Sequence, residues 1–327
     1  MKRPDSPSES LHRSFGLVWR SVALNLAELP TAKEETADVL VQEVNEQYWP
    51  YLPPGPHDTP FLQMGSGDLR LTVDGVGRFR VSGGDRITWQ RENVDVSDQD
   101  LRTFLLGSAV GALLIQRGML VLHGNALVKD GQAIVCLGHS GAGKSTLAYA
   151  LMQQGWRLLA DDLVAIAPDG LVLPGLPRIK LWEDAAVAFG LDPETLIPIR
   201  QGIRKYLLMG DRIERAEQPA PLGALYAIEQ DYPQQDEGKR IVVIPSQKGR
   251  TLYLRNLAYR PRFVRGLAQE AANFLFLARL QQTVPFAVLS TPLGIQAMGN
   301  WLGQVDLLEA AAAATEKASV ADTVGVS

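Results

Sequence analysis

The chain has 327 residues, of which 46% are hydrophobic and 21% charged, and its formal net charge is -4 at pH 7. This length allows one large domain or two smaller ones, and the composition is typical of a globular protein. The acidic balance lacks the positive field of most nucleic-acid-binding proteins, so we expect no nucleic-acid partner. Cys136 is the sole cysteine, which excludes an intramolecular disulfide and a cysteine-based zinc cluster.

No segment of the sequence predicts insertion into a membrane. The first ten residues are polar and lack the apolar centre of a signal peptide. The most apolar run, 104–115, is shorter than the about 20 residues that a spanning helix needs. Together with the low cysteine content, these features predict a cytoplasmic protein with no membrane partner.

Residues 1–98 are expected to form an N-terminal segment that contains a small β-rich layer. The first 13 residues resemble a loose tail, and 14–50 predict only weak order. Five prolines between 50 and 60 interrupt regular structure. From Leu62 onward, apolar and polar residues alternate between glycines, which is typical of short antiparallel strands joined by tight turns.

The middle of the chain predicts alternating strands and helices. Apolar patterns indicate a buried helix over 98–117, strands at 119–122 and 133–137, a helix over 144–154 and a strand at 156–160. Asp130-Gly131 provides a turn signal, and Gly155 stands where a helix often ends. The order strand, loop, helix, strand predicts an α/β fold.

Signals are weaker beyond residue 170. We expect a polar surface loop at 231–240, strands at 241–244 and 286–289, and one long amphipathic helix over 261–282 whose Arg262 and Arg265 face solvent. The alanine-rich end predicts a frayed tail. We therefore place a catalytic domain at 99–306 and a flexible tail at 307–327.

Residues 138–145 fit the phosphate-binding pattern G-x-x-x-x-G-K-[ST]. The glycines allow backbone N–H groups to face inward and form an anion nest at a helix N-terminus. Lys144 is expected to reach the β- and γ-phosphates of ATP, and the Ser145 hydroxyl to bind Mg²⁺. The full set of expected nucleotide-binding residues is Gly138, Ser140, Gly141, Ala142, Gly143, Lys144, Ser145 and Thr146. The alternative is a glycine-rich turn with an exposed lysine.

Asp161 and Asp162 close the strand that follows the phosphate-binding helix. Carboxylates at the carboxyl end of such a strand face the ligand crevice in α/β folds. A phosphotransferase needs an acidic group near its metal and can use a carboxylate to accept the hydroxyl proton. By position alone, a solvated turn remains the alternative.

Other candidate residues carry weaker signals. His123 precedes the phosphate-binding strand and fits either a structural or a functional histidine, whereas His139 occupies a variable loop position without an assigned role. Arg178 and Lys180 follow a proline-glycine loop and could neutralise phosphate oxygens, or else lie exposed on a surface strand. Lys205 is a weaker candidate of the same kind.

These pieces together resemble the catalytic domain of HPr kinase/phosphorylase, and more closely the related serine kinases of peptide-modification systems such as lasso-peptide pathways. The match comprises Leu122-His123-Gly124, Gly131, the loop from Gly138 to Thr146, Gly155, and Ala160-Asp161-Asp162. It extends loosely over 99–305. The resemblance implies an α/β fold with a P-loop core of the phosphoenolpyruvate-carboxykinase and HPr-kinase kind.

The resemblance also implies roles for individual residues. Asp161 would be the proton acceptor, Asp162 its partner at Mg²⁺, and His123 an orienting group. From its own position in the sequence, and not from the resemblance, Arg178 is expected to stabilise charge on the transferred phosphate. The implied activity is an ATP-dependent transfer of the γ-phosphate to a serine or threonine hydroxyl of a peptide or small protein.

One departure from the family affects the expected substrate. HPr kinases carry a Glu-Val-Arg-Gly signature after the P-loop region, and this sequence has no counterpart to it. We therefore expect a relative of these kinases that acts on a substrate other than HPr, and the sequence does not determine whether a reverse phosphorylase activity exists.

Several other functions were weighed against the sequence. A transporter ATPase should carry Leu-Ser-Gly-Gly-Gln, and a GTPase Asn-Lys-x-Asp, and neither motif is present. A non-catalytic ATP-binding regulatory protein and a kinase of a small metabolite both stay open. The oligomeric state and the identity of the acceptor are not determined by the sequence.

Overall fold

The computed structural model describes residues 9–45, 49–199, 202–229, 241–243, 254–255, 258–292 and 294–313. The chain is a mixed α/β structure that forms two compact units, one of residues 1–121 with 259–274 and the other of 122–258 with 275–327. This division differs from the boundaries that we expected at 98 and 306. None of the described helices is long and apolar enough to cross a membrane.

The first unit is built on a seven-stranded sheet. Its strands are β1 (Glu9–Ser14), β2 (Leu17–Val22), β3 (Val39–Glu43), β4 (Leu62–Gly65), β5 (Asp68–Val73), β6 (Gly77–Ser82) and β7 (Arg86–Arg91), in the order β1-β2-β3-β7-β6-β5-β4. Strands β4 to β7 form the antiparallel layer that the alternating pattern predicts. The prediction for the preceding segment was wrong, because β1, β2 and β3 are regular strands with Trp19, Val39 and Val41 fully or almost fully buried.

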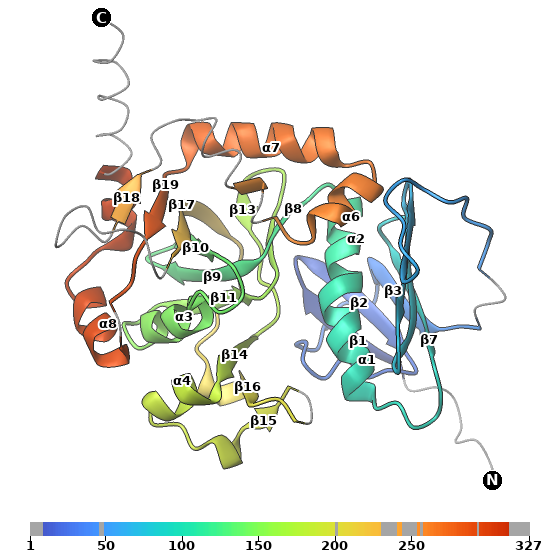
Figure 1. Ribbon diagram of the computed structural model, residues 1–327, viewed down its shortest axis with the longest axis horizontal. Coiled ribbons are helices and arrows are strands. Elements are labelled where there is room, and N and C mark those ends of the chain that lie inside the picture. Colours follow the sequence, from blue (N-terminus) through green and yellow to red (C-terminus); the bar gives the residue numbers. More distant parts are fainter. Residues whose placement is uncertain are drawn as a thin grey trace, which may run out of the picture. The chain divides into compact units, whose positions relative to one another are not determined.

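A helix covers this sheet, as Figure 1 shows. The expected helix over 98–117 appears as α1 (Asp98–Phe104), a π-helical segment (Leu105–Ala109) and α2 (Val110–Gln116). Ser97 caps its first turn by accepting a hydrogen bond from the backbone N–H of Asp100. Its apolar run is buried against the sheet, which explains its hydrophobicity without a membrane.

The long helix expected over 261–282 is divided into two. It consists of α6 (Pro261–Gly266) and α7 (Glu270–Thr283). Ala268, one of the three residues between them, has φ 58°, a left-handed conformation that a continuous helix does not permit. Arg262 and Arg265 are exposed, as expected.

The second unit contains a nine-stranded sheet together with a small three-stranded sheet. The large sheet includes β8 (Leu120–Leu122), β9 (Gly124–Lys129), β10 (Gln132–Leu137), β11 (Arg157–Asp161), β12 (Val164–Ile166), β13 (Leu171–Val172), β17 (Ala220–Ile228), β18 (Ile241–Val243) and β19 (Phe286–Leu289). The order β11-β9-β10-β17 forms its central part, and β19 pairs parallel with β17.

The small sheet packs against this core with one face and forms a lobe at its side. Its strands are β14 (Arg178–Trp182), β15 (Ile197–Pro198) and β16 (Lys205–Met209), in the order β14-β16-β15. Helix α4 (Glu183–Ala188) and two short 3₁₀ turns, Pro193–Thr195 and Gly210–Arg212, complete the lobe, which Figure 1 shows beside the large sheet.

Helices α3 (Lys144–Met152) and α8 (Ile295–Leu302) contact each other and belong to the hydrophobic core of the second unit. Residues 307–313 are helical, and Leu307 and Ala311 are buried in that core. The expectation that the tail is flexible from 307 was therefore wrong for this stretch, because its apolar side chains pack. The expected loop at 231–240 and the final residues, 314–327, lie outside the described residues.

The turn between β9 and β10 has the residues that its geometry requires. Asp130 and Gly131 have φ values of 50° and 78°, both in the left-handed region that favours an Asp-Gly pair in a tight hairpin. The hairpin sets Gly124 opposite Leu137 at the other end. A Cβ on Gly124 would lie 2.3 Å from the carbonyl oxygen of Cys136, so only glycine fits this crossing.

We expect Gly124→Ala to lower the free energy of unfolding by at least about 2 kcal/mol, because backbone must move to relieve the overlap. Gly131→Ala is the matched control. It has open space around the added Cβ and carries only the cost of a left-handed alanine, roughly 1 kcal/mol. Urea unfolding of both variants measures the difference, and equal losses would contradict this close approach.

Candidate active site

The strand register brings the chemically active residues to one edge of the large sheet. Strand β9 lies between β10 and β11 and pairs antiparallel with both, so β10 and β11 run parallel to each other. Asn125 on β9 is opposite Cys136 on one side and Asp161 on the other. The carboxyl ends of β10 and β11 therefore meet the start of β9 at the same edge.

The glycine-rich loop joins β10 to α3 at this edge. Gly143 occupies the N-cap position of α3 with φ 86°, a left-handed conformation that glycine adopts without steric cost. No side chain caps the helix there, and no acidic residue lies in its first turn. The free N–H groups of the first turn, and the positive end of the helix dipole, are suited to binding an anion.

Lys144 is largely buried directly behind this loop. Its Nζ donates to the carbonyl oxygens of Gly138 and His139, at 2.7 and 2.9 Å. Burial lowers the pKa of Lys144, with a smaller contribution from Lys205, although Asp161 and Asp162 act in the opposite direction. The ammonium group thus donates to two backbone carbonyl oxygens that phosphate oxygens could replace.

Asp161 is buried, with 2% of its surface exposed, and both carboxylate oxygens accept hydrogen bonds. Oδ1 accepts from the side-chain amide of Asn125, and Oδ2 accepts from the backbone N–H of Lys180 at 3.0 Å. Burial, and then the neighbouring charge of Asp162, raise the pKa of Asp161 to about 7. A carboxylate with this pKa can hold or release a proton near neutral pH.

Asp162 has the opposite electrostatic character. Burial alone would raise the pKa of Asp162, but the ammonium of Lys180, whose Nζ donates to Oδ2 at 2.7 Å, and further cations outweigh burial and lower it. Its backbone is left-handed, with φ 71°. Adjacent carboxylates with diverging pKa values are an arrangement that separates a proton-accepting group from a permanently charged one.

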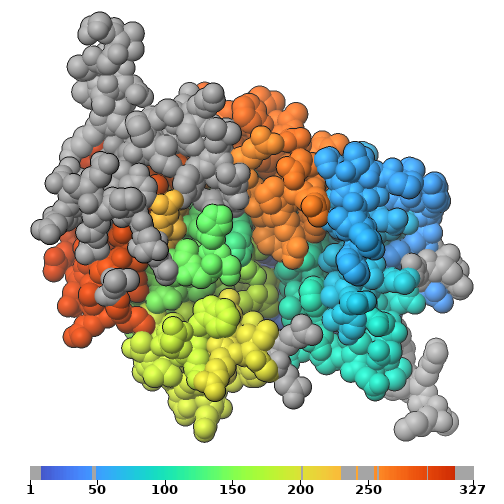
Figure 2. Space-filling model, viewed as in Figure 1, coloured from blue at the N-terminus to red at the C-terminus, as the bar shows by residue number. Residues whose placement is uncertain are grey.

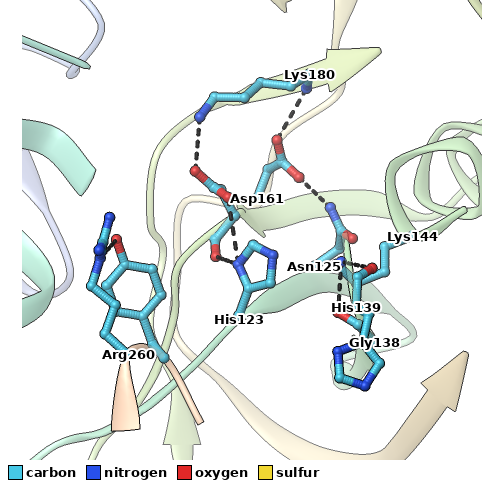
Figure 3. A network of polar contacts seen from close by, with 10 residues as sticks. His123, Asn125, Gly138, His139, Lys144, Asp161, Lys180 and Arg260 are labelled. Carbon is cyan, nitrogen blue, oxygen red and sulfur yellow. Dashed lines mark hydrogen bonds and ion pairs between the residues drawn. The ribbon is translucent and has the colours of Figure 1, made fainter. Parts of the chain in front are cut away.

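His123 lies directly before β9 and points toward the aspartate pair, as Figure 3 shows. Its Nδ1 lies 3.0 Å from the carbonyl oxygen of Asp162 and 3.5 Å from Oδ1 of that residue. Burial, and then the charge of Lys144, lower the pKa of His123. Because a carbonyl oxygen can only accept a hydrogen bond, the proton lies on Nδ1, and the Nδ1–H donates to this oxygen and orients the ring.

Two further lysines come from the small sheet. Lys180 on β14 holds Asp162, as described above. Lys205 on β16 lies one step along this sheet, opposite Trp182, and its Nζ is 5.3 Å from the centre of the Trp182 ring. Burial, and then the charge of Lys180, lower the pKa of Lys205. The small sheet thus supplies positive charge to the edge of the large one.

These elements surround a cavity of about 230 Å³. The structure brings most of the expected site residues to its wall, namely His123, Ser140, Gly141, Gly143, Lys144, Ser145, Thr146, Asp161 and Asp162. Gly138 and Ala142 belong to the loop but do not line the cavity, although Gly138 accepts the hydrogen bond from Lys144.

Arg178 is placed differently from the others. It lies at the start of β14 and is buried, with 4% of its surface exposed, and it is not among the described residues that line the cavity. Lys180, which the sequence indicates together with Arg178, and Lys205, the weaker candidate, line the wall instead. Arg178 and Lys180 share one face of β14, and Lys180 lies two residues nearer to Trp182 and its partner Lys205, where the cavity is.

Sequence reasoning missed three residues at this site. Asn125 holds Asp161, while Trp182 and Asp184 line the cavity beside the lysines. The signal for Asn125 was its position two residues after His123, a polar residue within an apolar strand. Nothing local to the sequence indicates Trp182 or Asp184, because their proximity depends on how the small sheet folds back.

The residues that line the cavity determine whether it can hold a metal ion. In the described part of the chain, no group of three or more His, Cys, Asp or Glu residues is arranged to hold a metal ion by itself. The cavity offers the Ser145 hydroxyl and carboxylates. Hydroxyl and carboxylate oxygens suit Mg²⁺, which keeps several waters and shares its coordination with substrate phosphates.

Comparisons with known proteins add little to this geometry. No family model matches the chain, and no curated protein matches it. The solved structures that it matches include the Hpr(Ser) kinase/phosphatase from Coxiella burnetii, at 20% sequence identity and a TM-score of 0.21, over 36% of this chain and 68% of that one. A likeness of this size carries no inference about activity, which has to come from the site itself.

The raised pKa of Asp161 predicts how stability changes with pH. The folded state holds a proton up to about pH 7, whereas the unfolded carboxyl releases it near pH 3.8, so the stability of the native protein falls as pH rises between these values. Asp161→Asn cannot ionise. We expect its stability relative to the native protein to increase by a few kcal/mol between pH 4 and 8.

The matched control for this experiment is Asp162→Asn. The folded pKa of Asp162 is lowered, so the native protein gains stability from this carboxylate as pH rises toward 3.8, and the variant should lose relative stability over that acidic range and not between pH 4 and 8. Denaturant unfolding at a series of pH values measures both. A relative stability of Asp161→Asn that stays level or falls between pH 4 and 8 would contradict the raised pKa of Asp161, and a level relative stability of Asp162→Asn below that range would contradict the lowered pKa of Asp162.

Asn125 is expected to hold the pKa of Asp161 down, because its amide donates to the ionised carboxylate. Asn125→Leu keeps the volume and burial but removes this donor. We expect the Asp161 pKa to rise above about 7 in this variant. Carbon-13 NMR titration of the aspartate carboxyls, with the resonance assigned through Asp161→Asn, measures the shift, and an unchanged or lower pKa would contradict the role.

Proposed function

We propose that this protein is an ATP-dependent phosphotransferase with a P-loop core of the phosphoenolpyruvate-carboxykinase and HPr-kinase kind. It would transfer the γ-phosphate to a serine or threonine hydroxyl of a peptide or small protein. The observation that carries this proposal is that one cavity is lined by the anion-binding loop, by Lys144 and by Asp161, whose pKa is about 7.

Each of these groups has a chemical part in the reaction. The N–H groups of the loop and Lys144 bind the phosphates, so Lys144 exchanges the carbonyl oxygens of Gly138 and His139 for phosphate oxygens. Lys180 and Lys205 add positive charge where negative charge develops in the transition state. In this account Asp161 accepts the hydroxyl proton, and Asp162, which stays ionised, keeps Lys180 in place.

Mg²⁺ would be held by the Ser145 hydroxyl and by a carboxylate of the aspartate pair, with Asp162 expected as the ligand. When bound, it neutralises charge on the phosphate oxygens. The remaining chemistry belongs to the protein. His123 holds the turn at Asp162 through its carbonyl oxygen, and Asn125 holds the Asp161 carboxylate in its orientation.

The phosphate is transferred in a single displacement step. The acceptor oxygen forms a bond to the γ-phosphorus as the bond between the γ-phosphorus and the bridging oxygen breaks, and ADP leaves with the electron pair. The proton of the acceptor hydroxyl passes to Asp161 and from there to solvent. A base with a pKa near 7 is suited to this step at neutral pH.

Two substitutions test the proposal. We expect Lys144→Ala to weaken Mg²⁺-ATP binding and abolish transfer, and Asp161→Asn to bind ATP within about threefold of the native protein while losing at least about 100-fold in transfer rate. Purified protein, γ-labelled ATP, Mg²⁺ and a protein extract are mixed, and labelled products are separated. Asp211→Asn and Lys129→Ala are controls, because both residues are exposed and lie outside the cavity lining.

The outcomes separate the candidate functions. Label on a polypeptide that disappears with Asp161→Asn supports the kinase. Label on a small molecule instead identifies a metabolite kinase that uses the same site. ATP binding that depends on Lys144, with no acceptor labelled under any condition, contradicts transfer and supports a nucleotide-binding regulatory protein.

A further inference from the structure

Exposed apolar side chains gather in the lobe that carries the small sheet. Trp182, Val187, Ile197 and Ile203 are 47%, 56%, 51% and 39% exposed, and all four lie within the segment 182–203. Figure 2 shows this lobe, in yellow-green, at the surface of the molecule. Exposed apolar side chains beside a cavity are a feature of surfaces that another molecule covers, so what matters is which of the four lie on the face that borders the cavity.

Strand alternation shows which of these side chains share one face. Ile179, Leu181 and Leu208 are buried in the core of the second unit, so they define the inner face of the small sheet. The neighbouring residues point the other way. We call this side the outer face, and we define it by Lys180, Trp182, Ile197, Lys205 and Leu207.

The outer face is continuous with the phosphate cavity. Lys180, Trp182 and Lys205 belong to both. Lys180 is opposite Leu207 in the sheet, and Leu207 is opposite Ile197 on the next strand. One row of side chains therefore leads from the lysine that holds Asp162 to an exposed isoleucine, over two strand spacings or about 10 Å.

The order of strands indicates from which side an acceptor hydroxyl reaches Asp161. The anion-binding loop follows β10, Asp161 ends β11, and β9 separates them. The small sheet lies on the far side of β11, because the N–H of Lys180 donates to Asp161 and the N–H of Gly175 donates to the carbonyl oxygen of Leu159. With the phosphates on the loop, the part of the cavity wall that remains open to a hydroxyl approaching Asp161 is formed by Lys180, Trp182 and Lys205 of the outer face.

We propose that the outer face is the docking surface of the acceptor, and that the acceptor is an extended polypeptide segment with an apolar side chain on Leu207 and Ile197. This inference rests on the proposed phosphotransferase activity. A segment that rises about 3.3 Å per residue covers 10 Å in about three residues. The apolar side chain therefore lies about three residues from the phosphorylated hydroxyl. A metabolite confined to a cavity of about 230 Å³ would not extend to Ile197.

A peptide library tests this docking mode. Short serine-centred peptides, each with one flanking position fixed, are phosphorylated with γ-labelled ATP. The native protein should prefer leucine or isoleucine over aspartate by at least about tenfold at one position, about three residues from serine. Ile197→Asp should lower kcat/KM for that peptide by a similar factor and favour arginine or lysine there, and Ile197→Lys should favour aspartate or glutamate.

The matched control is Val187→Asp, which adds the same charge at an equally exposed position of the lobe, on α4 rather than on the outer face. It should leave the preference unchanged. ATP affinity should be the same in all variants, because the loop is untouched. If the native protein shows no residue preference at any flanking position of the peptides, or if neither Ile197 variant alters the preference, the docking surface is wrong.

Failure of the docking surface can be told apart from failure of the activity itself. If native protein labels an acceptor in an extract in a manner that depends on Asp161, yet the library shows no position-dependent preference, the activity stands and the docking surface is wrong. If no acceptor of any kind is labelled, the activity fails and the docking surface fails with it.

Discussion

Strand β9 pairs antiparallel with both β10 and β11, and the geometry of the site depends on this arrangement. It makes the two outer strands parallel, so the loop after β10 and the aspartates at the end of β11 meet at one edge of the sheet. It also carries Asn125, whose side-chain amide donates to Asp161. His123, which immediately precedes the strand, donates to the carbonyl oxygen of Asp162. At Gly124 the neighbouring backbone of β10 comes so close that there is no room for a side chain. One strand therefore sets the distance between the phosphate-binding and proton-accepting groups.

Burying charged groups at this edge has a cost that the fold offsets through pairing. The carboxylates and lysines are largely withdrawn from water, and charge burial is tolerated only when partners and hydrogen bonds compensate. Lys180 does so for Asp162, while Asp161 is compensated by neutral donors and by a raised pKa. The left-handed backbone at Asp162 adds local strain of the kind found at functional sites. We interpret these costs as preorganisation for a highly charged ligand.

Much of this site, but less of the fold, could be predicted from the sequence. The glycine-rich loop and the aspartate pair are local signals, because each lies within one strand-to-helix or strand-to-turn junction. The division of the last long helix at Ala268 and the strands before residue 44 were missed, since neither depends on a strong local pattern. Lys205 and Trp182 reach the cavity only because a small sheet folds back beside β11. Contacts between distant segments of this kind carry no periodic or motif signal.

The central claim is that the phosphates of ATP lie between the glycine-rich loop and Asp161. An experimental structure with Mg²⁺ and a non-hydrolysable ATP analogue tests it most directly. We predict that Lys144 leaves the carbonyl oxygens of Gly138 and His139 and binds phosphate oxygens, with the terminal phosphate on the Asp161 side of the cavity. An analogue bound elsewhere, or a terminal phosphate directed away from Asp161 while Lys144 keeps its backbone hydrogen bonds, would contradict the account.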